Sequence, residues 1–180
     1  MSKLTQKQIL LFCLTLIILF CIPIYTIVVS TDTLKDGTEF LFKVRAFDPY
    51  DMFRGNYLNI SFEEQEIYGE FNTSSNNGHD DYYVTIGTNP DGFAYFSKIS
   101  KSKPVGTSDY FKTTAYYYSY DNFYRVDTPT RYYMNEKKSF NAEQKYRENI
   151  QNTYVKVRVK DGKMVIVGVY VDNILIDTID

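Results

Sequence analysis

The most distinctive segment of the chain brings acids, an arginine and a glycine together within eight residues: Asp48 and Asp51 precede Arg54 and Gly55. Two carboxylates are the pair that glycosidases use for acid–base chemistry. In this segment an arginine lies within a few residues of both acids, so both are expected to remain ionised rather than to separate in pKa. The residue types therefore favour a turn closed by an Arg54–Asp ion pair over a catalytic carboxylate pair.

Each residue of this segment has a structural explanation. Asp48 precedes Pro49, which holds it extended, and its carboxylate can accept backbone N–H groups in an Asx-turn. Gly55 supplies a position that tolerates a left-handed conformation. We expect Asp48, Pro49, Gly55 and Asn56 to form a structural turn, with the guanidinium of Arg54 bonded to Asp48 or Asp51.

Other catalytic or metal-binding arrangements have weaker support. The only cysteines, Cys13 and Cys21, lie in an apolar segment. The single histidine, His79, lies in the Asn- and Ser-rich stretch 72–80, which is expected to be a loop. One histidine without a second histidine or a cysteine nearby makes no recognisable zinc site, so no metal or cofactor is expected. We expect no enzymatic activity. The least favoured alternative is a Ser/Lys hydrolase, because no spacing rule connects the candidates Ser61, Ser97 and Lys98.

An apolar N-terminal segment would deliver this region to a membrane. Residues 9–29 form a run of 21 residues without a charge, which as a helix spans about 30 Å, the thickness of a bilayer core. A cleaved signal peptide is the alternative, but no small-x-small cleavage site follows the run. We expect residues 1–8 in the cytoplasm, 9–29 as a transmembrane helix in the lipid bilayer, 30–38 as a linker, and 39–180 as one outer domain.

The charge distribution sets the expected orientation and excludes one class of partner. Lys3 and Lys7 are the only charges before Asp32, and the positive-inside rule therefore places the N-terminus in the cytoplasm and the larger domain outside. All 22 acids and 18 of the 20 basic residues lie in the outer part, which carries a net charge of −4. Without a basic cluster to neutralise phosphates, nucleic acid is not an expected partner.

Alternating apolar residues predict strands on both sides of the motif turn. The first covers 39–47 and the second 56–67. Their inward faces would be formed by Phe40, Phe42, Val44 and Ala46, and by Leu58, Ile60 and Phe62.

Two turn signals predict hairpins farther along the chain. Asn89-Pro90-Asp91-Gly92 separates strands at 82–88 and 93–99, and Asp161-Gly162 separates strands at 153–160 and 164–172. The last hairpin would bury Val155, Val157, Val159, Val165, Val167, Val169 and Val171.

Residues 110–126 are β-rich in composition, and one short helix is expected near 139–150. In that helix Ala142, Tyr146 and Ile150 would share the face that packs on the sheet. These patterns predict a mainly β protein with minor α content, in which a transmembrane helix precedes one antiparallel β domain.

Two segments of the chain resemble a known family. The stretch 48–62, DPYDMFRGNYLNISF, is similar to the signature D-P-x-D-x-x-R-G-D-Y-x-x-L-x-Y of GDYXXLXY-domain proteins. Residues 123–136, followed by a short helix and a closing hairpin, resemble the family's second conserved region. The chain departs from the signature at Asn56, Ile60 and Phe62, and from the second region at Asn135 and Glu136. Asn56 removes a negative charge, which argues against a ligand or base at that position.

The resemblance implies a membrane-anchored protein whose relatives are often encoded beside multispanning membrane proteins. The leading hypothesis is therefore a non-enzymatic accessory or interaction subunit at the cell envelope, with another integral membrane protein as its partner. The alternative is a glycan- or peptide-binding module, because exposed tyrosines present flat amphipathic faces. The residues expected to contact the partner are Tyr50, Asp51, Arg54, Tyr57, Arg131 and Tyr132.

Overall fold

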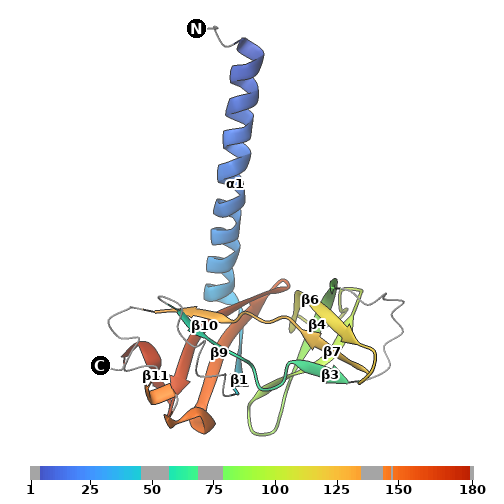
Figure 1. The fold of residues 1–180 in the computed structure, drawn as a ribbon, viewed down its shortest axis with the longest axis vertical. Helices are drawn as coiled ribbons and strands as arrows, with labels where there is room; N and C mark the ends of the chain where they lie inside the picture. Colours follow the sequence, from blue (N-terminus) through green and yellow to red (C-terminus); the bar gives the residue numbers. More distant parts are fainter. Residues whose placement is uncertain (1–4, 46–56, 69–78, 135–143, 147, 179–180) are drawn as a thin grey trace.

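A long N-terminal helix stands on a β domain and projects away from it for most of its length (Figure 1). The computed structural model describes residues 5–45, 57–68, 79–134, 144–146 and 148–178. The helix α1 runs from Gln6 to Asp36, a length of about 46 Å at 1.5 Å per residue. It is the only helix among the described residues that is long and apolar enough to cross a membrane.

The segment predicted as a linker is mostly helical. α1 continues without a break to Asp36, and strand β1 begins at Thr38. The reason is tertiary contact: the end of α1 packs against the sheet strands that follow Thr153, and Thr33 is buried there. The expected linker over 30–38 therefore contains the last turns of α1 and a single non-regular residue, Gly37.

The described strands of the β domain form three antiparallel sheets. The first is four-stranded with the order β1-β9-β10-β11, the second pairs β2 with β8, and the third is five-stranded with the order β3-β7-β6-β4-β5. Their bounds are β1 Thr38–Lys43, β2 Tyr57–Asn59, β3 Glu66–Tyr68, β4 His79–Thr88, β5 Ala94–Ser100, β6 Tyr110–Tyr118, β7 Phe123–Val126, β8 Arg131–Tyr133, β9 Thr153–Lys160, β10 Lys163–Val171 and β11 Ile174–Leu175. Two 3₁₀ turns, η1 Ile150–Asn152 and η2 Ile176–Thr178, complete the described elements. The predicted mainly β, antiparallel class is confirmed.

The five-stranded sheet curls into a near-barrel, because its two edge strands, β3 and β5, contact each other. The sheets share one hydrophobic core. At its centre the ring of Phe96 lies 5.1 Å from that of Phe42 and 5.5 Å from that of Phe111, which joins β1 to the five-stranded sheet. Phe62 packs edge-on against Phe42 at 5.1 Å, so the aromatic residue that ends the motif strand lies in the core.

The two predicted hairpins are confirmed. β4 and β5 pair around a turn in which Gly92 has φ of 83°. β9 and β10 pair around Asp161 and Gly162, whose φ values of 48° and 83° suit a tight hairpin turn. One boundary differs: β4 begins at His79, which pairs with Tyr116, so this histidine lies in a strand and not in the predicted loop.

The predicted inward face of β10 is wrong in its first half. Val165 and Val167 are half-buried, whereas Met164, Val169 and Val171 are buried. The ladder to β9 shifts register between Ile166 and Gly168, so Val167 is the extra residue of a β-bulge. One extra residue reverses the alternation of side chains. The alternating valines therefore face the core only after the bulge, at Val169 and Val171.

In their described parts, the strands that flank the motif do not pair with each other as a hairpin. β1 pairs with β9 and β2 pairs with β8. Among the described residues, the ladder contact between the two predicted strands is an isolated bridge, Val44 to Phe62. The predicted second strand is divided into β2 and β3, because Ile60 donates its backbone N–H to the carbonyl oxygen of Thr130 and the chain then turns toward β7.

The inward residues of these strands are as predicted wherever the structure describes them. The buried set comprises Phe40, Phe42, Val44, Leu58, Ile60 and Phe62. In the predicted helix, residues 144–146 and 148 are helical, Tyr146 is fully buried and Ile150 packs against the core. Ala46 and Ala142 lie outside the described residues.

Candidate functional site

Most of the motif turn lies outside the described residues. The predicted structural residues Asp48, Pro49, Gly55 and Asn56 belong to this part, as do the predicted contact residues Tyr50, Asp51 and Arg54. The ion pair between Arg54 and an aspartate therefore stays a prediction. The site is built from the residues that follow the turn and from the strand with which they pair.

A two-stranded ribbon brings the end of the motif next to the second family-like segment. β2 starts at Tyr57, directly after the turn, and pairs with β8 so that Tyr57 lies opposite Tyr133 and Asn59 opposite Arg131. These segments are more than 70 residues apart in the sequence. The pairing therefore places three of the predicted contact residues, Tyr57, Arg131 and Tyr132, on one small ribbon.

One face of the ribbon carries a cation and two aromatic rings. The guanidinium of Arg131 lies 5.2 Å from the centre of the Tyr57 ring, and the rings of Tyr57 and Tyr133 are 5.7 Å apart. Stacking on a ring is a favourable environment for a guanidinium. Arg131 and Tyr133 are exposed and Tyr57 is half-buried, so this face is available to a partner.

The opposite face anchors the ribbon to the core. Leu58 is fully buried, and the hydroxyl of Tyr132 donates to Asp177 at 2.6 Å. Burial, together with this hydrogen bond, raises the pKa of the Tyr132 phenol above its usual range. The hydroxyl of Tyr132, one of the predicted contact residues, is therefore bonded within the protein. Only its half-buried ring can contact a partner.

A groove separates this ribbon from the first sheet and the end of α1. Ser30, residues 131–133 of β8 and residues 163–166 of β10 line it, and its volume is about 380 Å³. A smaller hollow of about 200 Å³ adjoins it and shares Pro129, Lys163 and Met164. We call the two together the interfacial groove. Because Ser30 directly follows the apolar run of α1, the interfacial groove lies at the end of the candidate membrane span.

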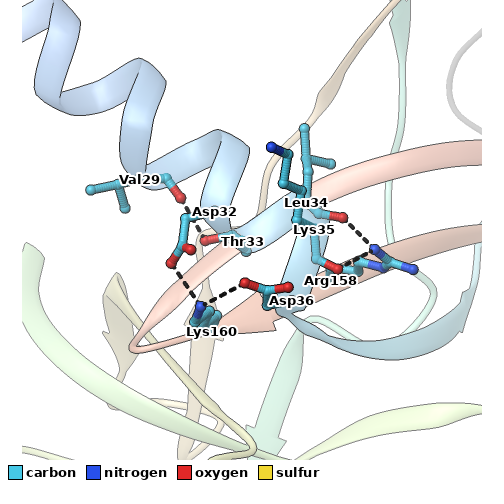
Figure 2. A network of polar contacts seen from close by, with 8 residues as sticks. All are labelled: Val29, Asp32, Thr33, Leu34, Lys35, Asp36, Arg158 and Lys160. Carbon is cyan, nitrogen blue, oxygen red and sulfur yellow. Dashed lines mark hydrogen bonds and ion pairs between the residues drawn. The ribbon is translucent and has the colours of Figure 1, made fainter.

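The end of α1 is fixed to the first sheet by polar contacts (Figure 2). The ammonium of Lys160 lies 2.8 Å from the carboxylate of Asp32 and 3.4 Å from that of Asp36. The guanidinium of Arg158 donates to the carbonyl oxygens of Leu34 and Lys35. Carbonyl groups at a helix C-terminus lack intrahelical partners. A cation there also interacts favourably with the negative end of the helix dipole. These contacts, which we call the helix clamp, hold helix and sheet in a defined orientation.

Gly37 makes the close junction of the helix clamp possible. A methyl group added at its α-carbon would overlap the carbonyl oxygen of Thr33, and it would also crowd the side chain of Arg158. Its backbone N–H donates to that same carbonyl oxygen at 2.9 Å. The sequence alone predicts only that Gly37 belongs to a polar linker, because its close contacts come from a distant strand.

A second hollow lies at the end of the first sheet that is remote from α1. Lys43, Phe93, Tyr154, Asn152 and Asn173 contribute to a cavity of about 510 Å³, which adjoins a smaller one of about 170 Å³. The rings of Tyr154 and Tyr170 are stacked 5.2 Å apart and nearly parallel. We call this region the distal aromatic hollow. Sequence reasoning missed it, although Tyr154 and Tyr170 stand opposite each other across the predicted hairpin.

The residues considered for other chemistry lie in ordinary structural positions. Ser61 is buried and accepts a hydrogen bond from Arg45, while Ser97 donates to the carbonyl oxygen of Thr85. Ser97 and Lys98 are both exposed in β5, where the ladder to β4 shifts register at Ser97. Among the described residues, no group of three His, Cys, Asp or Glu side chains is placed to hold a metal ion.

A family model described as GDYXXLXY protein matches residues 19–169. The matched range contains the C-terminal half of α1, the interfacial groove and nearly all of the described strands. No match was found among curated proteins or among solved structures.

Proposed function

Given that the chain belongs to the GDYXXLXY protein family, we propose that it is a membrane-anchored, non-enzymatic interaction subunit whose β domain lies outside the cytoplasm. Its partner is another integral membrane protein. The observation that carries this proposal is the unbroken passage of an apolar helix into the β domain, together with the helix clamp that fixes the two.

The dimensions of α1 support an anchor that holds the domain close to the bilayer. The apolar run covers about 30 Å, which matches a hydrocarbon core. Beyond Val29, residues 30–36 add about 10 Å of helix that is clamped to the sheet. A domain fixed in this way has a defined face toward the membrane, which suits binding to a neighbour in the same bilayer. Lys3 and Lys7 on the other side of the span support the outside location.

The composition of the ribbon supports protein binding at that face. Tyrosine and arginine are the side chains most enriched among those that dominate binding energy in interfaces. Tyr133 is 66% exposed, and Arg131 and Tyr57 lie beside it on the same face. A partner that packs along α1 would meet these side chains as it leaves the membrane.

Site-specific photo-crosslinking in membranes tests the proposal. A benzophenone amino acid at Tyr133 should give a discrete crosslinked band containing a second integral membrane protein. The same amino acid at Tyr120, which is 98% exposed in the turn between β6 and β7, serves as the matched control and should not give that band. Equal crosslinking from both positions, or none from Tyr133, would contradict the proposal.

A second candidate function rests on the distal aromatic hollow. A cavity of about 510 Å³ lined by Phe93, Tyr154 and two asparagines lies within the size range of small-molecule sites. Aromatic faces and amide groups together suit a glycan or an extended peptide. Saturable binding of a cell-envelope glycan fragment to the purified full chain, lost on Tyr154→Ala, would favour this function over the interaction subunit.

A further inference from the structure

We propose that the interfacial groove binds the headgroup of an anionic phospholipid, with Arg131 and Lys163 as the side chains that contact its phosphate. This assignment rests on the proposed function, because it requires α1 to lie in the membrane. It goes beyond that function by adding a lipid site to the protein-binding role of the ribbon.

The groove lies where lipid headgroups would be. Its wall includes Ser30, one residue past the apolar run of α1. The hairpin of β9 and β10 turns at Asp161-Gly162 beside the end of α1 (Figure 1), which brings Lys163 to the same level. The apolar side chains Val28 and Ile27 of α1 are exposed just inside this level. A lipid could therefore place its headgroup in the groove and its acyl chains along α1.

Arg131 and Lys163 are not neutralised within the described part of the chain, although the guanidinium of Arg131 also lies over the ring of Tyr57. Neither Arg131 nor Lys163 forms an ion pair with another described residue. In contrast, Lys156 and Lys160 of the same sheet are paired with Glu39 and Asp32. No carboxylate lines the main hollow of the groove. The smaller hollow is lined by one carboxylate, that of Asp127, which accepts a hydrogen bond from the hydroxyl of Thr114. Two unneutralised cations around an open hollow attract an anion, and Arg is well suited to phosphate oxygens.

The shape and polarity of the groove favour a headgroup over a helix from a partner. An α-helix about 10 Å across occupies roughly 400 Å³ per turn, so the main hollow of about 380 Å³ would hold a single turn. A partner helix would also cover Arg131 and Lys163, and buried charges need charged partners. A headgroup supplies that charge itself and leaves the outer side of the groove open to water.

Lipid titration of the full-length chain tests the assignment. In a nonionic detergent, short-chain phosphatidylglycerol should raise the thermal unfolding temperature saturably, because a ligand that binds the folded state stabilises it. Phosphatidylcholine of the same chain length tests the need for net charge, and inorganic phosphate tests whether the free anion is enough. We expect stabilisation by phosphatidylglycerol and little from the other two.

Charge substitutions locate the site. In Arg131→Gln/Lys163→Gln the affinity for phosphatidylglycerol should fall roughly 30-fold, which corresponds to about 1 kcal/mol for each cation. The matched control is Lys98→Gln/Lys145→Gln, which removes two exposed cations elsewhere and should keep the native affinity. The thermal unfolding of each variant without lipid reports whether it is folded. Arg131→Lys/Lys163→Arg, which keeps both charges, should still bind phosphatidylglycerol.

Three results would overturn the assignment. Equal stabilisation by inorganic phosphate would identify a site for a free anion. Native affinity in Arg131→Gln/Lys163→Gln would place the lipid elsewhere. A photo-crosslinker at Val165 that captures a polypeptide and no lipid in membranes would identify the groove as a protein site. The lipid titration tests the lipid site and needs no partner protein, whereas the crosslink from Tyr133 tests the proposed function. Either experiment can fail while the other succeeds, so the two failures are distinguishable.

Discussion

Tyr132 shows how single residues divide between structure and contact in this protein. Its ring forms part of the interfacial groove, while its hydroxyl donates to Asp177 inside the domain. The other carboxylate oxygen of Asp177 is buried without a hydrogen-bond partner among the described residues. The hydroxyl of Tyr132 therefore provides a hydrogen bond on which the C-terminal turn depends, and its loss is expected to reduce the free energy of unfolding.

The raised pKa of Tyr132 gives a prediction about alkaline stability. In the unfolded chain a tyrosine loses its proton near pH 10, but in the folded protein Tyr132 keeps it to higher pH. The unfolded state then binds fewer protons, so the free energy of unfolding falls as pH rises above about 10. Tyr146 contributes in the same direction, because burial raises its pKa to about 12.

Tyr132→Phe should lower the free energy of unfolding by about 1 kcal/mol near neutral pH, since one hydrogen bond to a half-exposed carboxylate is lost. It should also reduce the fall in the free energy of unfolding above about pH 10. The part of that fall that is due to Tyr146 should remain. Thermal unfolding of the full chain in detergent at about pH 8 and about pH 11 measures both effects. Tyr120→Phe is the control, and identical pH profiles for native protein and Tyr132→Phe would show that Tyr132 is not responsible.

At the scale of elements, the junction of α1 with the first sheet is the most unusual part of the fold. A polar segment of seven residues after an apolar span is commonly a flexible tether, and its composition predicted a linker. In the structure Arg158 and Lys160, more than 120 residues away in the sequence, bind its carbonyl and carboxylate groups. The hydrophobic segment and the β domain are thereby connected by a stiff element, which orients the ribbon relative to α1.

Arg158→Met should loosen the end of α1 without unfolding the sheet. Two helix carbonyl oxygens would lose their donor, a loss of about 1–2 kcal/mol in local stability. Hydrogen exchange by mass spectrometry should show faster exchange in the peptide covering residues 31–40. Arg125→Met is the matched control, because it breaks an ion pair with Glu66 at 2.8 Å on the five-stranded sheet. If the amide hydrogens of this peptide exchange at the native rate in both variants, Arg158 does not hold the end of α1.

At the scale of the whole molecule, α1 and the β domain form a protein with two separate surfaces. The ribbon and the interfacial groove lie beside α1, and the distal aromatic hollow lies at the opposite end of the first sheet. A surface near the bilayer suits lipids and membrane proteins, and a remote surface suits soluble envelope components. The orientation of the chain in the membrane therefore decides which compartment each surface meets.

Cysteine labelling tests that orientation. Cys13 and Cys21 are the only cysteines, and replacing both with serine gives a background for a single reporter. Tyr120→Cys in this background should react with a membrane-impermeant maleimide on intact cells, because the β domain is expected outside. Reaction only after lysis would place the domain in the cytoplasm. Release of the labelled domain from membranes by alkaline extraction would show that α1 is removed as a signal sequence.

Local patterns in the sequence determined the apolar span, the two hairpins and most of the buried residues. An uncharged run of 21 residues, an Asp-Gly turn and the alternation at residues 40–44 and 58–62 each act through neighbouring residues, so a short window contains the whole signal. The inward direction of Leu58, Ile60 and Phe62 follows from a period of two. The family signature also depends only on such a window.

Only the tertiary structure decided the partners of the strands, the bulge and the clamped helix end. β1 pairs with β9 and β2 with β8, and such pairings depend on the packing of the whole core against the entropy of closing long loops. The bulge at Val167 reverses a face that the valine pattern predicted. Arg158 and Lys160, which are distant in sequence, stabilise the helical form of a polar segment. Ionic and hydrogen-bonding partners held in place by a sheet override the conformational preference of the segment itself.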